Sequence, residues 1–95
     1  MARDQALVSC PNGEWTEITN ANATNITFQV RRGVALIRGA TTGTPPSVAL
    51  NGARYVSGEG TQNTPLSDLF AGAGIVRVFA RPGDGRALDI YVDHA

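Results

Sequence analysis

The sequence predicts an all-β fold, a small β-sandwich or barrel-like domain of about six to eight short strands with a one-turn helix near residues 65–70. Short runs in which apolar and polar residues alternate predict the strands, and clusters of Gly, Pro, Asn and Asp between the runs predict the turns. Only one stretch has a helical signature. A chain of 95 residues is long enough for one domain, so the residues after 13 are expected to form a single β domain, 14–95.

Residues 1–13 are expected to form an N-terminal arm or an edge strand. Ala6, Leu7 and Val8 favour a short strand, and Pro11-Asn12-Gly13 is a turn signal. An arm of this kind can pair with the sheet edge of a neighbouring chain. The alternative is an edge strand of the domain's own sheet, and the sequence leaves both open.

Residues 14–19 alternate and contain Trp15, the only Trp of the chain. Its large apolar ring favours an anchor in the core or at a subunit interface. A platform for stacking a sugar is the second interpretation. Residues 20–25 follow as a polar loop.

Residues 26–39 are predicted to form a hairpin that turns at Arg32-Gly33. A tight turn there would set Phe28 opposite Ile37 and Val30 opposite Ala35, because strand side chains alternate with period two.

Between residues 40 and 73 the sequence predicts mainly short elements and loops. Residues 40–47 are a Thr/Pro loop, residues 48–50 a short apolar piece and residues 53–56 a strand around Tyr55. Residues 58–63 are predicted to be loop. Thr64 is expected to cap the helix, with Pro65 at its first position. The apolar side of this helix is expected to close the open end of the sandwich.

Residues 74–92 give the strongest hairpin signal, two β-branched and aromatic runs around Pro82-Gly83-Asp84-Gly85-Arg86. The predicted register sets Val76 opposite Val92, Val78 opposite Ile90 and Ala80 opposite Leu88 on one apolar face. The other face would carry Arg77, Phe79 and Tyr91, with Arg77 opposite Tyr91 and close to Asp89 and Asp93.

The eight basic and eight acidic residues cancel, which argues against nucleic acid as a partner. All the basic residues are Arg, which reflects either codon composition or a surface made for contact, since Arg is enriched at interfaces and Lys is depleted. No apolar run is long enough to span a membrane. The N-terminus lacks the apolar core of a signal peptide, so we expect synthesis in a cytoplasm.

No pattern in the sequence predicts catalysis, a cofactor or a metal site. The carboxylates are scattered, and Cys10 is the only cysteine. Cys10 with His94 is the one imaginable nucleophile and base, but both lie near the chain ends. We expect Cys10 to act as a small hydrophobe and His94 to be a surface residue, and we expect the protein not to be an enzyme.

The layout resembles the small β-structured virion proteins of tailed bacteriophages. The resemblance rests on Ile-Thr-Phe-Gln-Val (26–30), Val-Ala-Leu-Ile-Arg (34–38), Gly-Glu-Gly (58–60), Pro-Leu-Ser-Asp-Leu-Phe (65–70) and the closing Val-Asp-His-Ala (92–95). It covers roughly residues 14–95, and its most distinctive piece is the Leu-Ser-Asp-Leu-Phe turn. It implies a β module that assembles on a virion, as a homo-oligomer, namely a trimer.

Within that resemblance, a capsid decoration (cement) protein of head-surface type is the first hypothesis, with the major capsid protein as partner and the capsid surface as location. The expected contacts are Ala6, Leu7, Val8, Trp15, Arg77, Phe79 and Tyr91. A receptor- or glycan-binding module of a tail fibre or head spike is the second hypothesis, with Trp15 and Tyr55 as its aromatic pair. The third is a tail or connector ring subunit.

Overall fold

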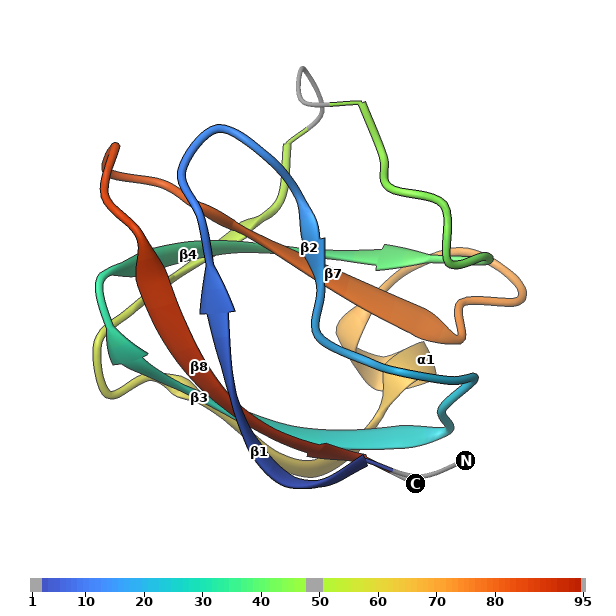
Figure 1. The fold of residues 1–95 in the computed structure, drawn as a ribbon. Coiled ribbons are helices and arrows are strands. Elements are labelled where there is room, and N and C mark those ends of the chain that lie inside the picture. The colour runs from blue at the N-terminus through green and yellow to red at the C-terminus, as the bar shows by residue number, and fades with distance from the viewer. Residues whose placement is uncertain (1–2, 48–50, 95) are drawn as a thin grey trace.

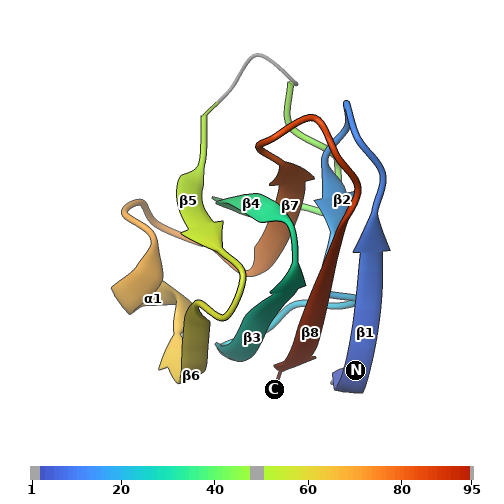
Figure 2. The ribbon, with the colours of Figure 1, turned by 90° about the vertical axis from the view of Figure 1, so that its left-hand side faces the viewer.

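The computed structural model describes residues 3–47 and 51–94, which form two four-stranded antiparallel sheets packed face to face (Figures 1 and 2). We call them sheet A, with strand order β1-β8-β3-β6, and sheet B, with order β2-β7-β4-β5. The all-β sandwich prediction is therefore confirmed. The elements are β1 (Arg3–Cys10), β2 (Thr16–Glu17), β3 (Asn25–Arg32), β4 (Val34–Ala40), β5 (Ala53–Val56), β6 (Gly60–Pro65), α1 (Leu66–Leu69), β7 (Arg77–Pro82) and β8 (Leu88–His94).

The core lies between the sheets and is built from every second residue of the long strands. In β8, Leu88, Ile90 and Val92 are fully buried while the residues between them are half-exposed. In β3 the same alternation buries Ile26, Phe28 and Val30, and in β4 it buries Ala35 and Ile37. The alternating pattern therefore identified the inward faces correctly, because side chains on a strand point to opposite faces in turn.

Neither predicted hairpin forms, because each pair of strands is divided between the two sheets. β3 belongs to sheet A and β4 to sheet B, so Phe28 and Ile37 are buried on the inner faces of different sheets and are not ladder partners. Only Gly33 separates the two strands, whereas the common hairpin turns need two residues. Gly33 has φ +95°, and its missing side chain lets the corner approach Leu88.

The C-terminal pair is divided in the same way. β7 pairs with β2 and β4, while β8 pairs with β1 and β3 (Figure 1). The predicted register of Val78 against Ile90 and Ala80 against Leu88 is therefore wrong, although all four side chains are buried as expected. Val76 lies just before β7 and is only half-buried.

Residues 60–65, predicted to be mostly loop, form β6 on the free edge of β3. Gly60 makes this pairing possible, because a Cβ at this position would collide with the carbonyl oxygen of Phe28. The sequence did not predict β6 because its side chains are mostly polar. A strand at the edge of a sheet does not need alternating apolar residues.

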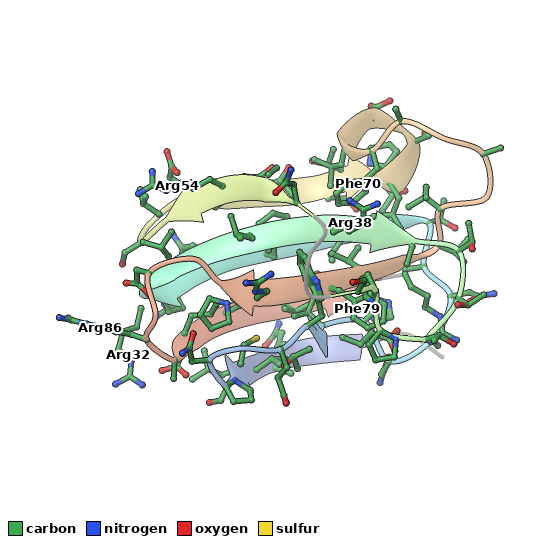
Figure 3. The ribbon with its side chains drawn as sticks, turned by 90° about the horizontal axis from the view of Figure 1, so that it is seen from above. Arg32, Arg38, Arg54, Phe70, Phe79 and Arg86 are labelled. Atoms are coloured by element: carbon green, nitrogen blue, oxygen red, sulfur yellow. The ribbon has the colours of Figure 1, made fainter. Side chains whose placement is uncertain are left out.

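The short helix α1 lies close to the predicted position, but its start differs. Thr64 is the penultimate residue of β6, and Pro65 occupies the N-cap without a side-chain capping bond. Leu66 is buried, and Leu69 and Phe70 pack against the core from the edge (Figure 3). The helix therefore closes the β5–β6 side of the sandwich, as expected (Figure 2).

Two interpretations of residues 1–13 were open, an arm and an edge strand. In the structure, Arg3–Cys10 form the edge strand β1 of sheet A. β1 pairs with β8 over most of its length, from Arg3 opposite His94 to Cys10 opposite Leu88. The short strand at residues 53–56 is present as β5. The apolar piece predicted at residues 48–50 lies outside the described residues.

Candidate docking surface

The exposed edge of sheet A is the surface that carries the predicted N-terminal contacts. β1 has β8 on one side, and no strand among the described residues pairs with its other side. Ala6 and Val8 sit opposite the core residues Val92 and Ile90, so both point inward and are half-buried. Leu7 points outward and is 63% exposed, the one large exposed hydrophobe of the described residues. The three candidates are therefore brought together on one strand but divided between its two faces.

An edge strand with an exposed leucine is a place where another chain can add a strand. Such an edge presents unpaired N–H and C=O groups, and natural proteins usually protect it with Lys, Pro or a covering loop. A bulge between Arg3 and Ala6 interrupts the pairing at the start of β1, where Gln5 has φ +26°. From Ala6 to Cys10 the ladder is regular, so this is the part suited to strand addition.

Trp15 is an internal anchor and does not lie on an open surface. Its side chain is only 5% exposed, and its indole N–H donates to the carbonyl oxygen of Ser47 at 3.0 Å. The Arg81 guanidinium lies 6.0 Å from its ring centroid, at the distance of a cation–π contact. Trp15 therefore fastens the loop after β4 to the outer side of sheet B.

The predicted face of Arg77, Phe79 and Tyr91 does not exist, because its members lie on two sheets. Arg77 and Phe79 are in β7, whereas Tyr91 is in β8. Phe79 is 1% exposed and lies outside the main core, on the side of sheet B where the loop after β4 also lies (Figure 3). Of the three, only Tyr91 lies on the outer face of sheet A.

Arg77 is held by partners on its own sheet and does not contact Tyr91, Asp89 or Asp93. Its Nη1 donates to the Glu17 carboxylate at 2.8 Å, and its Nε donates to the Asn22 side-chain oxygen at 2.9 Å. This network ties β7 to β2 and to the loop that follows β2.

Trp15 and Tyr55, the aromatic pair expected for a sugar site, do not meet. Trp15 immediately precedes β2, at one edge of sheet B, and Tyr55 is in β5 at the other edge. The Tyr55 ring packs edge-on against Phe28, with ring centroids 5.0 Å apart. Tyr55 therefore packs against the core between the two sheets.

Cys10 and His94 are too far apart to act together. They lie opposite Leu88 and Arg3, at the two ends of the β1–β8 pair. Burial raises the pKa of the Cys10 thiol to about 11, so the nucleophilic thiolate is disfavoured at neutral pH. His94 was expected at the surface but is 5% exposed, and its Nε2 accepts the backbone N–H of Asn20 at 3.2 Å.

Among the described residues, no three His, Cys, Asp or Glu side chains gather where they could hold a metal ion. In the same part of the chain, no helix has the length and apolar character needed to cross a membrane.

Searches of family models, curated proteins and solved structures return no match for this chain.

Proposed function

We propose that the chain is a non-enzymatic virion structural protein of a tailed bacteriophage, a capsid decoration protein made in the bacterial cytoplasm. It binds the outer surface of the major capsid protein lattice, assembles there as a trimer and stabilises the shell. The observation that carries the proposal is the open β1 edge, where Leu7 is 63% exposed. The sequence resemblance supplies the virion setting.

The mechanism is binding energy delivered at many equivalent sites. A strand of the capsid protein that pairs with β1 would satisfy its free backbone groups. Burying a leucine side chain contributes about 1.5–3 kcal/mol before the costs of association. Three copies in one trimer would multiply the effect, because the second and third contacts form at high effective concentration. The absence of net charge suits a protein lattice better than nucleic acid.

The test is the copy number of the chain in purified particles of the phage that encodes it, with its position in an averaged density map. Hundreds of copies over the shell, grouped in threes, are expected. A handful of copies at one vertex or on fibres would overturn the proposal in favour of a connector or receptor-binding subunit. Absence from particles would reject a virion role altogether.

The docking edge is tested separately with Leu7→Asp, which adds a charge to the outward face of β1. Because Leu7 is exposed, the free energy of unfolding should change by only about 0.5 kcal/mol. Occupancy on particles that lack the protein should fall at least about tenfold, since one buried charge costs well over 1.4 kcal/mol. The matched control is Arg54→Asp on exposed β5, which should bind normally. Normal binding of Leu7→Asp would exclude β1 as the contact.

A further inference from the structure

A single cross-strand row spans the outer face of sheet A. Leu7 of β1 lies opposite Tyr91 of β8, Tyr91 lies opposite Gln29 of β3, and Gln29 lies opposite Gly60 of β6. Residues directly opposite on neighbouring strands share a face of the sheet. The row therefore runs from the exposed leucine at one edge to a glycine at the other.

At the glycine end the row opens into a groove of about 410 Å³. Its lining includes residues Thr27, Gln29, Gly60, Thr61, Gln62 and Tyr91. The sheet is irregular here, with a register shift between Ile26 and Phe28. Bulges of this kind often lie beside functional sites, because they redirect neighbouring side chains. The groove is large enough for one or two sugar rings or a similar small ligand.

The groove offers neutral hydrogen-bonding groups beside one aromatic ring. The Thr27 hydroxyl accepts the Asn63 N–H at 2.7 Å, which leaves its own O–H to donate. The Gln29 side-chain nitrogen reaches the Gly58 carbonyl at 3.4 Å, which leaves the amide oxygen to accept. The Tyr91 hydroxyl donates to Asp93 at 2.8 Å, and this bond orients the ring along β8. Among the side chains that the structure describes, no Arg, Lys or His lines the groove.

We propose that this groove binds a neutral saccharide. A sugar ring has an apolar C–H face that packs on an aromatic side chain, and hydroxyls at its rim that pair with amides and hydroxyls. Tyr91 supplies the first, and Gln29, Gln62 and Thr27 supply the second. A phosphate or carboxylate ligand would need a cationic partner, which this lining lacks.

The saccharide site and the docking edge are independent. β1 and β6 are the two opposite edges of sheet A (Figure 2), so a partner strand that pairs with β1 does not pair with the β6 edge beside the groove. Failure of either proposal leaves the other standing.

The test is an NMR titration of the full ¹⁵N-labelled chain with cellotriose, maltotriose, mannotriose and triacetylchitotriose, each up to about 10 mM, a range suited to weak binding. At least one should shift the backbone amides of Gly58 and Gly60 and the side-chain amides of Gln29 and Gln62. A sialylated trisaccharide of similar size should bind at least about threefold more weakly, because the groove has no cation for its carboxylate.

Variants separate a saccharide site from general surface effects. Tyr91→Ala should weaken binding about tenfold, whereas Tyr91→Phe should stay within about threefold because it keeps the ring. Gln29→Ala should weaken binding about fivefold. Arg54→Ala, in β5 of the other sheet, is the matched control and should bind as the unchanged chain does. Each variant's spectrum reports directly whether it is folded.

Three results would overturn the proposal. The first is that none of the four saccharides shifts a groove amide. The second is that the shifts map away from β3, β6 and β8. The third is that a folded Tyr91→Ala variant binds with unchanged affinity. Selective binding of a peptide at the β6 edge in the same titration format would reassign the site to strand addition.

Discussion

The fold changes the chemistry of Cys10. Its side chain is fully buried at the end of β1, opposite Leu88, and burial raises the pKa of the thiol to about 11 from 9.0. Such a thiol stays protonated at neutral pH, so it contributes to packing and is chemically inert, because the thiolate is the reactive form.

We predict that the free energy of unfolding falls between about pH 9 and pH 11 because of Cys10. Below pH 9 the thiol is protonated in both states and adds no pH dependence. As the pH rises, the unfolded chain loses this proton first, so unfolding is favoured until the folded-state pKa of about 11 is passed. Urea unfolding at pH 8, 9, 10 and 11 measures the effect.

Cys10→Ala is the control for that experiment, since its stability should fall less steeply over the same range. Equal slopes in the two proteins would contradict the assignment. A thiol reagent at pH 8 should modify the folded chain no faster than the chain unfolds.

At the scale of elements, the pairing of β3 with β6 depends on one missing side chain. Gly60 lies opposite Gln29, and a Cβ there would meet the Phe28 carbonyl oxygen and the Gln29 backbone. Backbone atoms cannot rotate aside as a flexible side chain can, so the two strands would have to separate.

We predict that Gly60→Ala lowers the free energy of unfolding by about 3 kcal/mol, the upper range for forcing an extra group into a packed site. The matched control is Gly13→Ala. Gly13 has φ +87° and open space around its Cα, so this change should cost only about 1 kcal/mol of backbone strain. If denaturant unfolding shows that both variants lose the same free energy of unfolding, the close approach of β3 and β6 does not explain the effect of Gly60→Ala.

At the scale of the whole molecule, the first and last strands, β1 and β8, are neighbours in one sheet. Arg3 lies opposite His94, and β1 and β8 run side by side (Figures 1 and 2). Sheet A can close only after both β1 and β8 have been made, and pairing between distant segments is slow because loop closure costs entropy.

We predict that a circular permutant folds faster than the original chain. A short Gly/Ser linker joins residue 95 to residue 1, and new ends are opened at Gly85, which has open space around it. The permutant makes β8–β1 a local hairpin, so its folding rate should rise about tenfold while its melting temperature stays within about 10 °C. Stopped-flow refolding measures the rate. A slower or unfolded permutant would contradict the β1–β8 pairing.

Alternation in the sequence was enough to predict the fold class and the buried faces of β3, β4 and β8. Ile26, Phe28 and Val30, and likewise Ile90 and Val92, are inward because alternation has a period of two in any sheet. The tight corner at Gly33 and the short helix near residue 66 were also visible as local signals.

Which strands are neighbours depends on packing between segments far apart in the sequence. An alternating strand buries the same face whether its chain neighbour lies beside it or across the core, so the pattern cannot tell a hairpin from a corner between sheets. The pairing that forms in sheet A joins strands far apart in the sequence: β8 pairs with β1, and β3 pairs with β6. In the folded chain Phe79 and His94 are buried, and Tyr91 lies beside Gln29. Because the groove depends on this pairing of distant strands, it had no signature in the sequence.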